Sequence, residues 1–377
     1  MTSRKLTVAV LFGGRSGEHE VSLESAACVM EAIDRRKYDV LPIGITREGR
    51  WIASGDPLAA LRSGQVNGHQ QTALLPGDPT APGLIRLPAA APGPAGPPAA
   101  GAGPVVQRID VVFPVLHGPY GEDGTVQGLL ELAGIPYVGS GVLGSAVGMD
   151  KLAMKRLFQH AGLPLVPYLA IRKADWARRP AELLEQVGDL LGFPVFVKPA
   201  NLGSSVGITK VGRAAELEGA IALAFQYDRT VLVEEGLEVR EIECGVLGND
   251  DPEVSVVGEV VPRREWYDYE AKYTPGLAEV VIPAPLPPAL AEAVREMSLR
   301  AFRAIDAAGL ARVDFFLDKR SGQLYVSEIN TMPGFTRTSM YPKLWAASGL
   351  DYPSLVDRLI ALALERGAER RALRTTR

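Results

Sequence analysis

The sequence predicts an α/β fold that opens with a Rossmann-like domain, and three observations support this prediction. Residues 6–12 form a continuous apolar run that ends in two glycines, as expected of a buried parallel strand entering a turn. Residues 21–33 then have the apolar spacing of a helix, and residues 38–45 have the pattern of a second strand, which completes a βαβ start. Near the other end of the chain, residues 312–330 hold two β-rich runs around a polar, glycine-containing turn, the pattern of a hairpin.

Composition limits the classes of function. The chain has 377 residues, enough for two or three domains, and its 47% hydrophobic and 22% charged residues are ordinary for a soluble globular protein. A formal net charge of −4 gives no sign of a nucleic-acid or membrane partner. Cys28 and Cys244 lie in apolar segments without CxxC spacing, so we expect buried thiols of a reducing compartment rather than a disulfide. No secretory pattern and no run of about 18 uncharged apolar residues is present, so we expect a cytoplasmic protein.

The turn after the first strand is rich in glycine, but its pattern is neither GxGxxG nor GxxxxGK[ST]. A dinucleotide fingerprint is therefore absent. The turn still places backbone N–H groups and the carboxylate of Glu18 at the start of a helix, where small ligands bind in open α/β sheets. Glu18 and Glu20 could equally be first-turn acids that favour the helix dipole.

Residues 53–107 interrupt the pattern of strands and helices. Proline, alanine and glycine dominate there, so we expect a surface insertion without regular structure. The fold resumes with a buried strand over residues 109–116, and His117 follows it at the carboxyl edge of the sheet, where ligand binding and a structural role are equally plausible. A helix over residues 125–133 and a short strand over residues 135–138 close the first domain.

The middle of the chain carries two lysines in a pattern suited to phosphate. An amphipathic helix over residues 149–161 carries Lys151, and a strand over residues 193–199 ends near Lys198, which faces the Gly/Ser-rich segment 200–208. The N–H and hydroxyl donors of such a segment can close over phosphates while lysine supplies the charge. A plain hairpin turn is the alternative.

The later elements again alternate between strands and helices. Residues 231–237 form a strand that leads to a hinge, and its edge can bond an adenine through the backbone, although nothing in the residues requires this. Residues 266–276 are aromatic and polar, and we expect a loop that covers a site. The alternative is that its aromatic side chains only hold the loop itself in place. The tail after residue 365 is basic and alanine-rich, and we expect it to be frayed and solvated. Further helices are predicted over residues 216–225, 290–307 and 352–365, and further strands over residues 242–247 and 254–261.

The hairpin over residues 312–330 is the strongest candidate for a site. If its loop is residues 320–322, with glycine last, then Asp314 lies opposite Glu328 and Arg312 lies opposite Asn330, all on one face. Two carboxylates that face each other repel and destabilise the hairpin. A divalent cation between them attracts both, so that the arrangement becomes stabilising. Carboxylates and an amide oxygen suit Mg²⁺, which takes further ligands from substrate phosphates, and the arginine beside them can stabilise a phosphate or an oxyanion. A solvated polar face with an ordinary salt bridge is the alternative.

Taken in chain order, these segments resemble the ATP-grasp superfamily and, more closely, the D-alanine–D-alanine ligase family. The resemblance covers nearly the whole chain except residues 53–107 and the tail. Its motifs are specific in combination and include FGGxSxExEVS from residue 12, HGxxGEDG from residue 117, GSG from residue 139, MDK from residue 149, KP from residue 198 with GSSVG from residue 203, YDYEAKY from residue 267, RVD from residue 312 and EINTMPG from residue 328.

The resemblance implies a three-domain ATP-grasp architecture with an N-terminal Rossmann-like domain. Residues 1–139 would bind the first D-alanine, residues 140–237 would carry the phosphate flap, and residues 238–377 would carry the metal site and the covering loop. The implied reaction is the ATP-dependent ligation of two D-alanines through a D-alanyl phosphate, releasing ADP and phosphate, for peptidoglycan precursor synthesis. It also implies two Mg²⁺ ions, for which Mn²⁺ can substitute, and a homodimer.

The resemblance also assigns roles to individual residues. Catalytic roles fall to Glu18, Ser204, Tyr273 and Arg312. Nucleotide binding falls to Lys151, Lys198, Ser205, Glu234, Leu237, Glu241 and Lys272. Substrate binding falls to His117, Gly334 and Ser339, and metal binding falls to Asp314, Glu328 and Asn330. The sequence departs from the family pattern in the adenine hinge, where Gly236 stands in place of a larger residue that is often found.

Two alternatives remain at this stage. The first is a sister ligase with D-lactate or D-serine as second substrate, although Tyr273 argues against D-lactate because the family pairs tyrosine there with an amino substrate. The second belongs to another class, a non-catalytic nucleotide-binding regulator or a redox protein reading NAD. The missing GxGxxG and the complete metal set argue against it.

Overall fold

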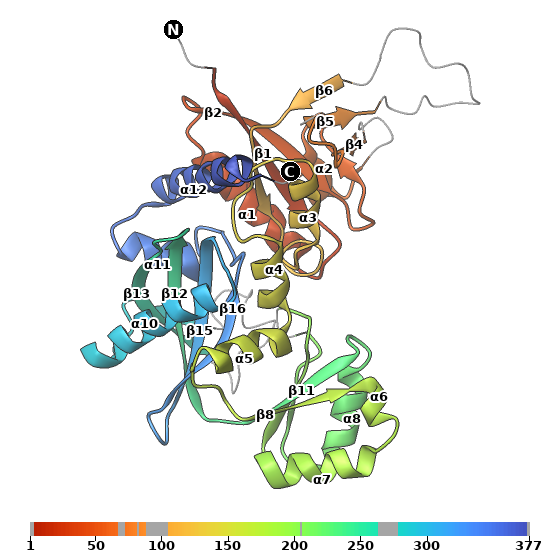
Figure 1. Ribbon diagram of the computed structural model, residues 1–377, viewed down its shortest axis with the longest axis vertical. Helices are drawn as coiled ribbons and strands as arrows, with labels where there is room; N and C mark the ends of the chain where they lie inside the picture. Colours follow the sequence, from red (N-terminus) through yellow and green to blue (C-terminus); the bar gives the residue numbers. More distant parts are fainter. Residues whose placement is uncertain are drawn as a thin grey trace, which may run out of the picture.

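The computed structural model describes residues 4–66, 72–80, 83–87, 105–203, 206–262 and 278–374. Figure 1 shows three α/β parts arranged along the long axis. The N-terminal part lies at one end, the C-terminal sheet lies in the middle, and the small central part lies at the other end. The C-terminal helix returns to pack against the N-terminal part.

The first part is built on a four-stranded sheet in the order β3-β2-β1-β7. Strand β1 (Leu6–Gly13) runs parallel to β2 (Tyr38–Ile45) and to β7 (Val111–Val115), while β3 (Trp51–Ile52) is antiparallel to β2. Helix α1 (His19–Ala32) connects the first two strands, which confirms the predicted βαβ start. Because side chains alternate along β1, its residues supply two separate apolar cores on the two faces of the sheet.

Two predictions for the first part are wrong. Residues 53–107 are not without structure: they include α2 (Pro57–Ser63) and a small antiparallel sheet of β4 (Ala73–Leu74), β5 (Gly83–Arg86) and β6 (Val105–Arg108). The fully buried Leu84 joins this sheet to the main core. Residues 135–138 form no strand but only a single bridge between Val112 and Tyr137, after α3 (Thr125–Leu132).

The central part begins with two helices where one was predicted. Helix α4 (Val142–Met149) ends before Asp150, whose side chain accepts bonds from two N–H groups of the first turn of α5 (Lys151–His160). An antiparallel sheet in the order β10-β9-β11-β8 follows, built from β8 (Tyr168–Arg172), β9 (Val195–Pro199), β10 (Thr209–Val211) and β11 (Thr230–Glu235). The helices α6 (Lys173–Trp176), α7 (Pro180–Leu191) and α8 (Ala214–Ala224) accompany it.

The last part is a five-stranded antiparallel sheet in the order β14-β13-β12-β15-β16. Its strands are β12 (Val239–Gly248), β13 (Glu253–Pro262), β14 (Ala278–Val281), β15 (Gly309–Asp318) and β16 (Leu324–Asn330). Helix α10 (Pro288–Ala304) packs its apolar face on this sheet, and α11 (Met340–Ala347) contacts β12 and β13.

The C-terminal helix is longer than predicted. Helix α12 runs from Tyr352 to Ala372, so residues 366–372 are not a frayed tail. Arg366 donates to the backbone oxygens of Tyr137 and Gly139 and lies over the Tyr137 ring, and Arg370 pairs with Glu131. None of the described helices combines the length and apolar character needed to cross a membrane. Cys28 and Cys244 are both free thiols, and Cys244 is buried as expected, whereas Cys28 is only partly buried.

In the β15–β16 hairpin the site residues pair as predicted, although the loop that joins the two strands differs from the predicted one. Arg312 lies opposite Asn330 and Asp314 opposite Glu328. The loop, however, holds residues 319–322, one more than predicted, because the N–H of Asp318 bonds to the oxygen of Gln323 at 2.9 Å. A bulge after Asp314 shifts the register back by one residue.

Candidate active site

The face of the hairpin that carries the predicted metal ligands is a compact charged network. Arg312 donates to both carboxylate oxygens of Asp314, each at 2.7 Å, and its Nε lies 2.9 Å from an oxygen of Glu243 on β12. The side-chain amide of Asn330 donates to Asp314 at 2.9 Å. Burial opposes the charge of Arg312, but Asp314 and Glu243 raise the pKa of the guanidinium well above its usual range. The arginine therefore stays charged, in a fixed orientation.

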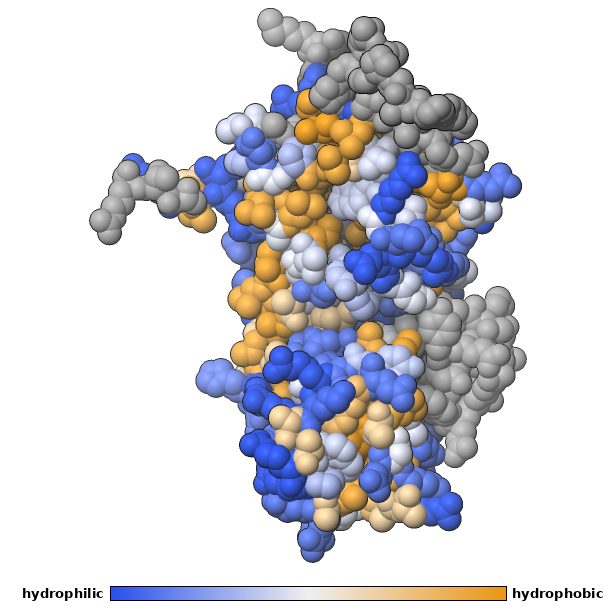
Figure 2. Space-filling model, turned by 90° about the vertical axis from the view of Figure 1, so that its right-hand side faces the viewer, coloured by the Kyte–Doolittle hydropathy of each residue, from blue (hydrophilic) through white to orange (hydrophobic). Residues whose placement is uncertain are grey.

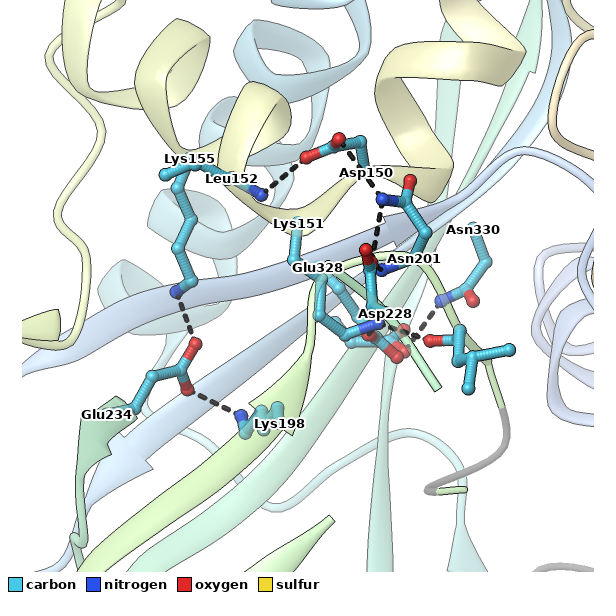
Figure 3. Close-up of polar contacts among 12 residues, drawn as sticks. Asp150, Lys151, Leu152, Lys155, Lys198, Asn201, Asp228, Glu234, Glu328 and Asn330 are labelled. Carbon is cyan, nitrogen blue, oxygen red and sulfur yellow. Dashed lines mark hydrogen bonds and ion pairs between the residues drawn. The ribbon is translucent and has the colours of Figure 1, made fainter. Parts of the chain in front are cut away.

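Helix α5 brings a lysine to the same face. The Nζ of Lys151 donates to the backbone oxygen of Leu202 at 2.5 Å and lies 3.9 Å from a carboxylate oxygen of Glu328. Leu202 belongs to the Gly/Ser-rich segment after β9, so the lysine lies between that segment and the hairpin. Figure 3 shows Lys151 and Glu328 together near Asn330. The ammonium group of Lys151 thus lies beside the acidic face of the hairpin.

The second predicted phosphate lysine lies in a buried ion-pair cluster. Glu234 on β11 accepts from Lys198 on β9 at 2.5 Å and lies 3.0 Å from Lys155 on α5 (Figure 3). Both Glu234 and Lys155 are buried. Burial favours the neutral acid, but Lys155 and Lys198 outweigh it and lower the pKa of Glu234 to about 2. This carboxylate is ionised at any ordinary pH.

His117 is buried and both of its ring nitrogens are bonded within the protein. Nδ1 lies 3.0 Å from the backbone oxygen of Met332, and Nε2 lies 3.2 Å from the hydroxyl of Ser25 on α1. The same hydroxyl accepts from the N–H of Phe335 at 3.3 Å. Because a carbonyl only accepts, Nδ1 carries the proton and Nε2 accepts from Ser25. Burial lowers the pKa of His117, against the opposing charge of Glu18, and keeps the ring neutral.

This chain of bonds ties the N-terminal part to the segment that follows β16. Residues 332–335 are held at both ends, by His117 at Met332 and by Ser25 at Phe335. Gly334 lies between these two anchors, and a Cβ at that glycine would come 3.1 Å from the hydroxyl of Ser339. The two residues predicted to bind the second substrate are therefore neighbours.

Glu18 lies where the N-terminal part meets the Gly/Ser-rich segment. A Cβ built at Gly118 would come 3.0 Å from a carboxylate oxygen of Glu18, and one built at Gly203 would come 3.2 Å from the same oxygen. Both glycines thus allow the backbone to approach this carboxylate closely. Burial, followed by the charge of Glu18, raises the pKa of Glu122 well above its usual range. The end of the flap and two acidic side chains of the first part therefore lie together.

The predicted metal ligands are of the chemical type that Mg²⁺ prefers. Asp314, Glu328 and Asn330 supply hard oxygen donors on one face, and facing carboxylates favour a cation between them. Among the described residues no cluster of three or more acidic, histidine or cysteine side chains is arranged as a metal site. A site of two carboxylates and one amide leaves open positions for the oxygens of a phosphate, as is usual for Mg²⁺.

The structure brings most of the predicted residues together. Glu241 lies on β12 opposite Phe316 of the hairpin, and Leu237 lies in the connection from β11 to β12. Four predicted residues lie outside the described residues, namely Ser204, Ser205, Lys272 and Tyr273.

Sequence reasoning missed three residues of these networks. Lys155, Ser25 and Glu243 each hold a predicted site residue in place. For Lys155 a signal was present, because it lies four residues after Lys151 and so shares its helix face. Glu243 has no local signal, since its role depends on β12 pairing with β15.

Chemically, the site offers fixed positive charges beside an acidic face that suits a divalent cation. Lys151, Lys198 and Arg312 are the cations, contributed by α5, β9 and β15. Such a set suits a polyphosphate and a carbonyl that gains negative charge during reaction.

Comparisons with known proteins agree with this geometry. A family model described as "D-ala D-ala ligase N-terminus" matches residues 7–140, and one described as "D-ala D-ala ligase C-terminus" matches residues 157–361. A curated D-alanine–D-alanine ligase of Heliobacterium modesticaldum is 50% identical over 376 residues, which cover 99% of this chain and 98% of the relative. The D-alanine-D-alanine ligase from Coxiella burnetii superposes with a TM-score of 0.81 at 34% identity, covering 97% of each chain. The VanG D-Ala:D-Ser ligase from Enterococcus faecalis superposes with a TM-score of 0.83 at 34% identity, covering 96% of this chain and all of that one (100%).

Proposed function

The chain belongs to the D-alanine–D-alanine ligase family and has its ATP-grasp fold, and from this premise we propose how its own residues perform the reaction. The enzyme joins two D-alanines at the expense of ATP, for peptidoglycan precursor synthesis. The carboxylate of the first D-alanine attacks the γ-phosphate of ATP, the bond to the β-phosphate breaks, ADP leaves, and an acyl phosphate forms. The amine of the second D-alanine then attacks that carbonyl, and phosphate leaves.

We assign the phosphates of ATP to Lys151 and Lys198. Their ammonium groups lie at the acidic hairpin face and at the buried Glu234, on two elements that flank the Gly/Ser-rich segment. Ser205 and Lys272 are proposed to add donors to the nucleotide, and Glu234, Leu237 and Glu241 are proposed to lie around its adenine and ribose. Bound divalent metal, held by Asp314, Glu328 and Asn330, would neutralise charge on the phosphates.

We propose that Arg312 and the backbone N–H of Gly334 bind the oxygen of the reacting carbonyl. The bidentate bond to Asp314 holds the guanidinium in one orientation, and the bonds of His117 and Ser25 hold the backbone on either side of the glycine. Preorganised donors of this kind stabilise a tetrahedral oxyanion without reorganisation during the reaction.

The two amino acids are proposed to bind on either side of that carbonyl. Glu18 would hold the ammonium of the first D-alanine, in a network with Ser204 and Tyr273. Ser339 and the backbone at Gly334, which lie together, would receive the carboxylate of the second. The direct substrate contact first predicted for His117 remains a proposal, and its present bonds favour a positioning role.

The observation that carries this proposal is the opposed pair Asp314 and Glu328 beside Arg312 and Lys151. The test supplies ATP, Mg²⁺ and D-alanine, measures phosphate release and identifies D-alanyl-D-alanine by mass. We expect both products, and we expect a chelator to abolish them and Mn²⁺ to restore them. No phosphate release with D-alanine alone would refute the assignment.

The D-serine or D-lactate alternative is not favoured. The curated relatives at about half identity are D-alanine–D-alanine ligases, whereas the D-Ala:D-Ser ligase is 34% identical. The same assay with each alternative acceptor measures the preference directly, and D-alanine should give the highest rate.

We further propose the division into three domains over residues 1–139, 140–237 and 238–377, a cytoplasmic location and a homodimer. Separate sheets in each of the three segments support the division. For the dimer, exposed apolar side chains of α3 and α4 offer support, namely Leu132, Val142 and Leu143. Figure 2 shows apolar side chains gathered on the upper half of one face of the molecule. Light scattering on the purified protein tests the dimer, and a monomer at micromolar concentration would refute it.

A further inference from the structure

Helix α5 carries two lysines that face two different carboxylates. Lys151 and Lys155 are four residues apart, so they lie one above the other on the same side of the helix. Lys151 lies 3.9 Å from Glu328 of the hairpin, and Lys155 lies 3.0 Å from Glu234 of the central sheet. Figure 3 shows the two lysines reaching from the helix toward these acids. The helix therefore spans the phosphate end and the base end of the proposed nucleotide site.

Lys155 is unusual because it is buried. Only 1% of its surface is exposed, and the Nζ atom lies over the ring of Tyr168, 5.3 Å from its centre. A lysine is almost never buried to this degree unless it is paired. Its partner is Glu234, and this carboxylate also bonds to Lys198 at 2.5 Å. Two ammonium groups thus share one carboxylate.

The sharing matters because Lys198 is proposed to bind a phosphate. When its ammonium group turns toward a phosphate, it weakens or gives up its bond to the carboxylate of Glu234, which is 3% exposed. Without a second cation, that step would leave a buried negative charge with no partner, a strongly unfavourable state. Lys155 is already in place, 3.0 Å from the other oxygen of the same carboxylate.

We propose that Lys155 is a positioning residue for nucleotide binding, a resident counter-ion of Glu234 that allows Lys198 to exchange this carboxylate for a phosphate of ATP. The inference rests on the proposed roles of Lys198 and Glu234. Lys155 itself touches no substrate in this arrangement. It also keeps Glu234 an ionised acceptor.

An ionised acceptor at the base end has a consequence for nucleotide choice. The exocyclic amino group of adenine donates hydrogen bonds, which a carboxylate accepts. Guanine has a carbonyl oxygen at the same ring position, which a carboxylate repels. Lys155 therefore also supports discrimination between ATP and GTP.

The experiment compares Lys155→Met with Arg156→Met in the full chain. Arg156 is the exposed neighbour on the same helix and serves as the matched control. The KM for ATP, the KM for D-alanine and the calorimetric affinity for ADP are measured for each variant. In Lys155→Met we expect roughly 10–100-fold weaker nucleotide binding, by analogy with the loss seen when a residue that holds a metal ligand in place is removed. The KM for D-alanine should change little, and Arg156→Met should match the unaltered enzyme.

Two further variants separate the role from a general loss of fold. Lys155→Arg keeps the charge and should restore most of the ATP affinity, and Lys155→Gln repeats the comparison if the methionine variant does not fold. The ATP-over-GTP preference should fall together with the affinity. A folded neutral variant with unchanged KM for ATP, or with equal losses for ATP and D-alanine, would overturn the inference. Failure of the unaltered enzyme to bind ATP would instead refute the proposed function, so the two failures are distinct.

Discussion

Removing the hydroxyl of Ser25 should loosen the catalytic segment and destabilise the fold. Ser25→Ala deletes the bond from the N–H of Phe335 at 3.3 Å and the bond to Nε2 of His117 at 3.2 Å. His117 and Phe335 are buried, so Nε2 of His117 and the N–H of Phe335 each lose their partner in the protein interior. Each such group costs about 1–3 kcal/mol, so we expect a loss of about 3 kcal/mol in the free energy of unfolding. At about 2–4 °C per kcal/mol, the unfolding temperature should fall by roughly 6–12 °C.

The kinetic consequence is separable from the stability loss. With the Ser25 anchor gone, Phe335 keeps only the bond from the Tyr352 hydroxyl to its backbone oxygen, so Gly334 is held less firmly. We therefore expect kcat to fall about tenfold or more at temperatures where the variant is folded. Ser298→Ala is the matched control, because this buried serine bonds a carbonyl of its own helix α10 at 2.7 Å and the thiol of Cys244, but none of the proposed site residues. Calorimetry and phosphate release are measured on both variants. Equal unfolding temperatures and equal kcat in Ser25→Ala and the unaltered enzyme would refute the reasoning.

Three further predictions concern the charges and the hinge. Arg312→Lys loses the planar fork that bonds both oxygens of Asp314 at 2.7 Å, so phosphate release should fall by about tenfold or more despite the retained charge, and an unchanged rate would contradict the role. Because the pKa of Glu234 is lowered from 4.5 to about 2, its stabilisation is present above 4.5 and is lost as the pH falls toward 2. Between pH 4.5 and pH 2, the unfolding temperature should therefore fall more steeply with decreasing pH in the unaltered enzyme than in Glu234→Gln. Equal slopes for the two proteins would contradict a stabilising role of the ion pairs. Gly236→Ala places a Cβ 2.6 Å from a backbone oxygen, so the KM for ATP should rise, whereas Gly219→Ala, with open space around it, should leave that KM unchanged.

The sequence predicted elements well where one local pattern decides the structure. Strand β2 has the predicted bounds, and β1 extends one residue beyond its prediction. A continuous apolar run has only one way to be buried in a parallel sheet, so its pattern is sufficient. The paired faces of the hairpin were predicted for the same reason, because alternation fixes which side chains share a face.

Other features depend on contacts that are distant in the sequence. Leu84 packs into the main core although its surroundings are rich in proline, alanine and glycine, so composition alone suggested no structure there. The end of α12 is stable because Arg366 and Arg370 bond to the first part of the chain, more than two hundred residues away in sequence. Lys155 gains its importance only when β11 presents Glu234 to α5. The sequence shows that Lys155 is charged, but not which carboxylate it pairs with in the fold.

The hairpin shows how a correct site can follow from an incorrect turn. The predicted three-residue loop alone would pair Asp314 with Glu328, whereas the observed four-residue loop alone would pair it with Ser327. The side chain of Asp318 accepts from the N–H groups of Arg320 and Ser321 and so stabilises the longer loop, a role for aspartate that turn chemistry allows. The bulge after Asp314 then restores the pairing. Without it, Glu328 would point to the opposite, apolar face of the sheet, so the bulge is the feature on which the acidic pair depends.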